Sequence, residues 1–131
     1  QFVPVNTSWG FNNRSVSFRI PSGPGHARRI EHRIAGAEAN PYLVMAAVLA
    51  GIHYGLTQSL EPTPPSTGNA GEQADAEMPL KLWRALDRLE GSTVLADYLG
   101  VDYPGAFAEI KRAEFDAFMT EILPREYDWY V

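Results

Sequence analysis

Cysteine is absent from the 131-residue chain. Its absence excludes a disulfide framework, thiolate zinc sites and a cysteine nucleophile. Long apolar runs are missing too, because the run at residues 42–52 falls well short of the roughly 18 residues that a membrane span requires. No basic segment followed by an apolar run opens the chain, so no secretory signal is expected. These absences predict a cytoplasmic protein that has no membrane partner.

Lysine is scarce, and neither of the two lysines lies in the first 33 residues. That segment carries five arginines and a single acid, Glu31, for a charge of +4, whereas the remaining residues carry −9. Arginine grips phosphate and carboxylate groups through two parallel N–H donors. A cationic segment on an acidic body therefore indicates a local anion site rather than a diffuse nucleic-acid surface. A solvated edge strand with self-screening charges is the alternative.

Two segments, residues 15–20 and 28–34, alternate apolar and polar side chains as β-strands do. The loop between them is rich in glycine and proline, so the strands are most simply an antiparallel pair. In the second strand the alternation places three charged residues on one face: Arg29, Glu31 and Arg33. Arg14 and Arg19 are five residues apart, so strict alternation sends them to opposite faces. Either a bulge or a strand end intervenes, or one of the two serves structure or a neighbouring subunit.

The rest of the chain is predicted to be mostly helical, from residue 40 to about 125. Asn40 is a suitable N-cap and Pro41 a suitable first residue for a long apolar helix. Such a helix should lie inside a larger body. Residues 61–78 are rich in proline, serine and glycine and should form a surface loop. With strands in about residues 1–35, the fold class is α+β.

Glu31 is the one acid among the five arginines of the first segment. Flanked by cations, it should stay ionised to low pH. An ionised carboxylate beside phosphate-binding arginines is a suitable ligand for magnesium or manganese. An ion pair with Arg29 or Arg33 is the simpler interpretation, because a hard metal needs more oxygen ligands than this segment offers.

Two tripeptides, Asn6-Thr7-Ser8 and Asn13-Arg14-Ser15, match the N-glycosylation pattern. Because no secretory context accompanies them, glycosylation is not expected.

Several of these residues form motifs that resemble the C-terminal catalytic half of glutamine synthetases. The motifs are Asn13-Arg14-Ser15, Arg19-Ile20-Pro21, Ala27-Arg28-Arg29-Ile30-Glu31-His32-Arg33 and Ala39-Asn40-Pro41-Tyr42-Leu43. The resemblance is contiguous over about residues 9–60. Residues 8–10 and 35–38 are closer to the γ-glutamylpolyamine (γ-glutamylputrescine) synthetase branch. In the adenylylated bacterial enzymes of the family that the chain resembles, a tyrosine occupies the loop after the long apolar helix. Residues 61–78 hold no tyrosine, so the resemblance does not imply regulation by adenylylation.

The resemblance implies an ATP-dependent ligase that joins glutamate to ammonia or a small amine through γ-glutamyl phosphate. By motif position, it implies that Arg14 and Arg33 contact the transferring phosphoryl group and the substrate carboxylate. It implies that Arg19 and Arg29, together with Arg14, hold the phosphates of ATP. Glu31 would bind one of two divalent ions, Mg²⁺ or Mn²⁺. The resemblance also implies that the strands belong to a catalytic barrel and that the full-length protein is a double-ring homo-oligomer.

On this interpretation the chain is the C-terminal segment of a larger catalytic domain, and the fragment alone is expected to be inactive. A glutamine synthetase-like homologue kept as a structural or binding protein is the alternative function. An arginine-rich RNA-binding module would need base-stacking aromatic residues interleaved with its arginines, and the first segment offers few of them.

Overall fold

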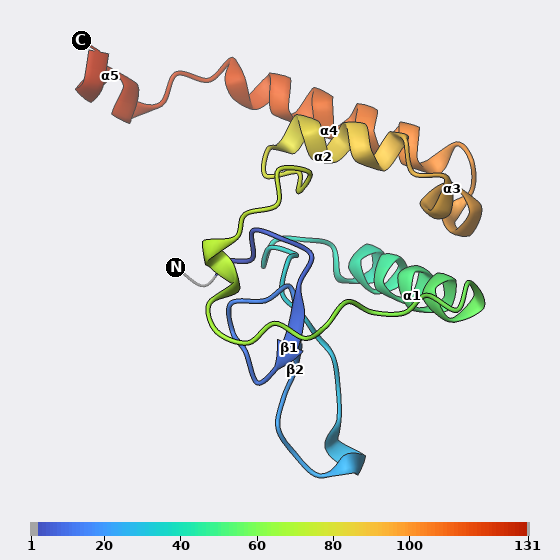
Figure 1. Cartoon of the computed structure of the whole chain (residues 1–131). Helices are drawn as coiled ribbons and strands as arrows, with labels where there is room; N and C mark the ends of the chain where they lie inside the picture. The colour runs from blue at the N-terminus through green and yellow to red at the C-terminus, as the bar shows by residue number, and fades with distance from the viewer. Residues whose placement is uncertain (1–2, 131) are drawn as a thin grey trace. The chain divides into compact units, whose positions relative to one another are not determined.

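A computed structural model describes residues 3–130 of the chain (Figure 1). The chain falls into two compact units, Gln1–Leu80 and Lys81–Val131. The described residues of the first unit form three short strands and the long helix α1, and those of the second form the helices α2 to α5. Between residues 3 and 130, no helix is both long and apolar enough to cross a membrane. The first unit holds all the residues predicted to bind ligands.

The sheet of the first unit has the order β1-β2-β3, with β1 at Trp9–Phe11, β2 at Phe18–Ile20 and β3 at Glu31–His32. β2 and β3 are antiparallel, as expected, but β1 adds a third strand that runs parallel to β2. The predicted antiparallel pair is therefore present, but the sheet that contains it is mixed and not purely antiparallel. The described residues form an open three-stranded sheet and not the barrel itself. The fold is α+β.

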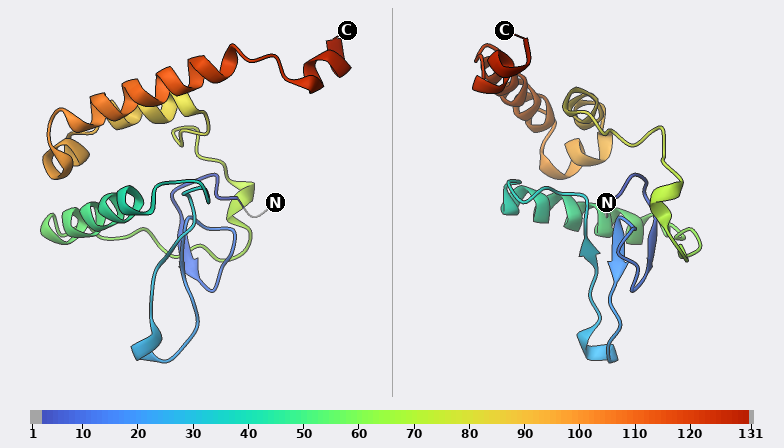
Figure 2. Two further views of the ribbon diagram at one scale, coloured as in Figure 1. Left: turned by 180° about the vertical axis from the view of Figure 1, so that it is seen from behind. Right: turned by 90° about the vertical axis from the view of Figure 1, so that its left-hand side faces the viewer.

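β2 is shorter than the alternating segment at residues 15–20 that predicted it. The backbone N–H groups of Ser17 and Phe18 both donate to the carbonyl of Ser8, each at 3.1 Å. The Ser17 hydroxyl donates to the carbonyl of Asn6 instead of facing solvent. The chain bends here and becomes a strand only at Phe18. The connection from β2 to β3 extends away from the sheet, with the short 3-10 helix η1, Gly25–Ala27, at its tip (Figures 1 and 2).

Helix α1 covers Pro41–Thr57 and begins as predicted. The Oδ1 atom of Asn40 accepts hydrogen bonds from the backbone N–H groups of Tyr42 (3.0 Å) and Leu43 (3.3 Å), which satisfies two of the unpaired donors of the first turn. Only Ala50 of this helix is buried within the described chain. The described residues therefore cover little of α1, and they do not by themselves form the larger body that the sequence predicts around this helix.

An apolar cavity of about 490 Å³ lies between one face of the sheet and α1. Phe18 and His32, which are paired across β2 and β3, line it on the sheet side, and Val44 and Val48 line it on the helix side. The rings of Phe18 and His32 meet edge to face, with their centroids 5.4 Å apart. Burial lowers the pKa of His32, because the apolar surroundings disfavour the imidazolium. This face of the sheet thus carries apolar contacts, and the charged residues occupy the other.

The loop at residues 61–78 is bound along the start of the chain. The backbone N–H of Ser66 donates to the carbonyl of Trp9 at 2.7 Å, and the indole Nε1 of Trp9 donates to the carbonyl of Thr63 at 2.6 Å. Asparagine amides hold the loop as well. The Nδ2 atom of Asn13 donates to the carbonyls of Ser66 (3.2 Å) and Gly68 (2.8 Å). This segment, residues 61–78, is called the bound loop below.

Gly10 lies where β1 and the bound loop come closest. A Cβ atom at Gly10 would lie 2.7 Å from the carbonyl oxygen of Ser66. This oxygen belongs to the backbone, so it cannot move away without a shift of the main chain. Substitution Gly10→Ala should therefore lower the free energy of unfolding by about 1–3 kcal/mol, as overpacking does. Urea denaturation followed by circular dichroism measures this. Gly25→Ala is the control, since no atom lies within 4 Å of a Cβ at Gly25. Equal effects of the two substitutions would contradict the prediction.

The second unit contains α2 (Leu82–Glu90), α3 (Thr93–Leu99), α4 (Tyr103–Met119) and α5 (Pro124–Tyr130). α2 and α4 lie side by side and run in opposite directions (Figures 1 and 2). Trp83 packs edge to face on Phe115, and Arg112 pairs with Glu90 at 2.6 Å. α5 extends beyond residue 125, where the helical region was expected to end. The packing of α2 on α4 gives this unit its core.

Candidate functional site

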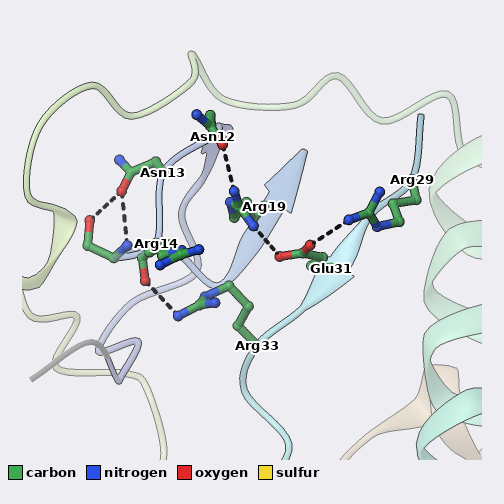
Figure 3. Close-up of polar contacts among 8 residues, drawn as sticks. Asn12, Asn13, Arg14, Arg19, Arg29, Glu31 and Arg33 are labelled. Atoms are coloured by element: carbon green, nitrogen blue, oxygen red, sulfur yellow. Dashed lines mark hydrogen bonds and ion pairs between the residues drawn. The ribbon is translucent and has the colours of Figure 1, made fainter. Parts of the chain in front are cut away.

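The charged face of the sheet follows from the strand register. Arg19 on β2 stands directly opposite Glu31 on β3, so both side chains lie on the same face. The Nη1 atom of Arg19 donates to Oε2 of Glu31 at 2.8 Å (Figure 3). The two side chains are only 14% and 28% exposed. A cross-strand pair this well covered has a fixed geometry, unlike most surface ion pairs.

Two further groups complete the contacts of this pair. The Nη2 atom of Arg19 donates to Oδ1 of Asn12 at 2.6 Å, so the guanidinium is held from two sides. The Nη2 atom of Arg29 approaches Oε1 of Glu31 at 3.3 Å, from a side chain that is 61% exposed. Arg19 is therefore the principal partner of Glu31, and Arg29 is a looser one.

These contacts set the charge state of Glu31. The hydrogen bond from Arg19 holds the pKa of Glu31 below its ordinary value; desolvation opposes this shift, and the charges of Arg19 and Arg29 add to it. The carboxylate is thus ionised throughout the neutral range, as the sequence predicted. The ion pair with Arg29 is one of the two that the sequence suggested as the simpler interpretation. The shorter pair with Arg19 was not, and only the cross-strand register could have indicated it.

Arg33 and Arg14 meet at the neighbouring end of the site. The Nη2 atom of Arg33 donates to the backbone carbonyl of Arg14 at 2.7 Å (Figure 3). The backbone N–H of Arg33 donates to the carbonyl of Ser17, which extends the antiparallel pairing by one hydrogen bond. Arg14 lies in the bent segment before β2, so the alternation of the strand does not reach it. A strand end, one of the alternatives left open by the sequence, therefore separates Arg14 from Arg19.

The arrangement has donors suited to an anion such as a phosphate group. The Nη1 and Nη2 atoms of Arg19 each carry a second N–H beyond the hydrogen bonds to Glu31 and Asn12. The Nε atom is buried, and no described residue accepts a hydrogen bond from it. Arg14 is exposed, and Arg29 is largely so. Guanidinium groups whose N–H donors are not all used can bind phosphate oxygens in pairs. The chemistry of these residues thus fits the phosphates of ATP.

A metal site is not formed by the described part of the chain. Between residues 3 and 130, no three histidine or carboxylate side chains lie close enough together to hold an ion. Glu31 could supply a single oxygen ligand, whereas a hard divalent ion prefers about six.

Sequence reasoning missed Asn12 and the structural role of Asn13. Asn12 has a φ of +50°, in the left-handed region that asparagine tolerates better than most residues. Oδ1 of Asn13 accepts from both the backbone N–H (2.9 Å) and the hydroxyl (2.7 Å) of Ser15. The Asn12-Asn13 pair after an aromatic strand was the available signal, since asparagines of this kind form turns.

Comparisons with known proteins place these residues in a wider context. The protein family described as "Glutamine synthetase, catalytic domain" matches residues 1–130. The chain is 41% identical over 128 residues to "Gamma-glutamylputrescine synthetase PuuA" of Escherichia coli, covering 98% of this chain and 27% of that protein. It is 40% identical over 104 residues to "Glutamate--isopropylamine ligase" of a Pseudomonas species, covering 79% of this chain and 22% of that protein.

A third relative extends the match to another domain of life. The "Glutamine synthetase" of Methanococcus maripaludis is 35% identical over 137 residues, covering 98% of this chain and 31% of that protein. The chain therefore spans less than a third of the length of each of these three relatives.

Proposed function

Because this chain belongs to the glutamine synthetase catalytic-domain family, we propose that the whole protein is an ATP-dependent ligase that makes a γ-glutamyl amide from glutamate and an amine. The observation that carries the proposal is the covered Arg19–Glu31 pair, with Asn12 and Arg29 around it and a second N–H left on each terminal nitrogen of Arg19. Family membership supports a ligase, and this cluster supplies cations of the kind that phosphoryl transfer needs.

The proposed reaction has two steps. A γ-carboxylate oxygen of glutamate attacks the γ-phosphorus of ATP, the bond to the bridging oxygen breaks, and ADP leaves with that electron pair. The amine nitrogen then attacks the acyl carbon of γ-glutamyl phosphate, expels inorganic phosphate and loses a proton. Charge builds on phosphoryl oxygens in the first step, so fixed cations account for much of the stabilisation.

In this proposal each arginine has the role that its position in the family motifs implies. Arg19 and Arg29, on either side of Glu31, would bind ATP phosphates together with Arg14. Arg14 and Arg33, which meet next to the start of β2, would contact the transferring phosphoryl group and the substrate carboxylate. The two sets lie next to one another in the first unit, as in-line transfer between two substrates requires.

The proposal includes further parts outside the described residues. Mg²⁺ or Mn²⁺ would neutralise phosphate charge, with Glu31 as one ligand and the remaining ligands from elsewhere in the protein. Assembly into a double-ring homo-oligomer and a cytoplasmic location belong to the same proposal.

The amine is proposed to be an alkyl amine rather than ammonia. Two of the relatives reported above are named for putrescine and isopropylamine, and residues 8–10 and 35–38 resemble the polyamine branch. The full-length protein should release ADP in the presence of glutamate, ATP, Mg²⁺ and putrescine, and mass spectrometry should detect the γ-glutamyl amide. Isopropylamine, ethanolamine and ammonia complete the panel, and aspartate in place of glutamate is the negative control.

Two outcomes of this panel would contradict parts of the proposal. Preference for ammonia over every alkyl amine would refute the choice of amine and leave a glutamine-forming ligase. Absence of any ADP release and of any amide, from a folded full-length protein with all four amines, would refute the ligase function.

A further inference from the structure

We propose that Asn12 is a positioning residue that aims the Arg19 guanidinium at the nucleotide phosphates. This inference rests on the proposed function, because it takes Arg19 to be a phosphate-binding group. The contact that carries it is the 2.6 Å hydrogen bond from Nη2 of Arg19 to Oδ1 of Asn12.

The backbone fixes where the Asn12 side chain lies. Asn12 follows β1 directly, and its N–H donates to the carbonyl of Ile20 at the end of β2, at 2.9 Å. Its φ of +50° turns the chain at this point. Within residues 3–130, Ser59 is the one other non-glycine residue with a positive φ. The backbone of Asn12 thus fixes the direction of its Cα–Cβ bond, and the hydrogen bond from Arg19 holds the side-chain oxygen Oδ1.

The second step concerns the orientation of the guanidinium. A long arginine side chain held at one end nitrogen can still rotate about that contact. Arg19 is instead held at both terminal nitrogens, because Nη1 donates to Glu31 and Nη2 donates to Asn12. The two contacts define the plane of the group and the direction of its remaining donors. Binding a phosphate then costs less conformational entropy than it would for a mobile arginine.

The side chain of Asn12 contributes little to the core, because Asn12 is exposed. Its contact with Arg19 therefore concerns the position of the guanidinium more than the stability of the fold. Asn12 also lines an open cavity of about 550 Å³ together with Arg14, which the proposed function places at the transferring phosphoryl group. Asn12 thus contacts Arg19 and lines the same open cavity as Arg14.

The test measures the dissociation constant for ATP, with Mg²⁺, by isothermal titration calorimetry on the full-length protein. Asn12→Gly removes the acceptor and keeps a backbone suited to positive φ. It should weaken binding about ten-fold, as loss of a hydrogen bond to a charged group does. The KM for ATP should rise in parallel, and the KM for glutamate should stay within about two-fold. Asn12→Asp, which keeps an acceptor at the same place, should restore binding to within about three-fold.

Ser59→Gly is the matched control. Ser59, just after α1, is the other non-glycine residue with a positive φ among residues 3–130, and its replacement by glycine should leave ATP binding unchanged. Asn12→Ala serves if the glycine variant cannot be purified, with the same ten-fold loss expected. An unchanged dissociation constant in the variant lacking the acceptor, at equal melting temperature, overturns the inference and leaves the ligase function standing. ATP binding that depends on Asn12 in a protein that forms no amide supports the inference and refutes the ligase function. A wild-type protein that binds no ATP overturns both.

Discussion

Substitution Arg19→Ala in the full-length protein should lower kcat/KM for amide formation by about 100- to 1,000-fold, the range seen when one fixed donor to a charged transition state is removed. Two losses combine. The phosphates lose a guanidinium held by both Glu31 and Asn12. Glu31 in turn loses its shortest cationic contact, because only the 3.3 Å approach of Arg29 remains among the ion pairs described for it. Steady-state kinetics with varied ATP measure the effect.

Arg112→Ala is the control for loss of a paired arginine. Arg112 pairs with Glu90 at 2.6 Å and with Asp87 at 3.0 Å, so its deletion removes comparable contacts from the second unit. Its kcat/KM should stay within about three-fold of wild type, since exposed ion pairs contribute little. A similar loss in both variants would mean that Arg19 acts through general stability. A loss below ten-fold for Arg19→Ala alone would remove Arg19 from the proposed phosphate site.

The sequence predicted the elements that depend on local patterns. The Asn40-Pro41 cap was correct because capping needs only neighbouring residues. The antiparallel pairing of β2 and β3 was correct because one short connection joins them. β1 was missed because its three residues are too few to show alternation, and because parallel pairing with β2 depends on contacts made after the chain bends.

The candidate site was predictable in composition but not in geometry. Five arginines and one acid indicated an anion site, and the motifs indicated which of them belong to a ligase. The pairing of Arg19 with Glu31 follows from the strand register, which the alternation alone does not fix. Asn12 escaped notice because its contribution depends on a backbone angle and on a partner seven residues away.

The two Asn-x-Ser tripeptides are another case in which the sequence pattern did not predict the structural role of the residues. By pattern they are glycosylation sites, and in the structure both are turns. Oδ1 of each asparagine accepts from the serine two residues on, and its Nδ2 donates to carbonyls of the bound loop. In this way Asn6 and Asn13 tie the bound loop to the start of the chain at two points.

This arrangement predicts a large effect for Asn13→Asp. The carboxylate keeps the acceptor for Ser15 but loses both donors, and it sets an oxygen against the carbonyls of Ser66 and Gly68. The free energy of unfolding should fall by about 2–3 kcal/mol, from two lost hydrogen bonds and the carbonyls left facing an oxygen. Because Arg14 is the next residue, kcat/KM should fall about ten-fold as well, through displacement of its guanidinium.

Asn6→Asp makes the matched comparison, since Asn6 loses two donors, to Ala70 and Gln73, and is not adjacent in sequence to any arginine assigned to the site. Urea denaturation should show similar losses of stability for the two variants. Hydrogen exchange should rise in the bound loop of both, because its backbone N–H groups are released. Only Asn13→Asp should also lose about ten-fold in kcat/KM, with Asn6→Asp within about three-fold of wild type. Equal kinetic losses would show that the bound loop supports the fold as a whole and does not specifically position Arg14.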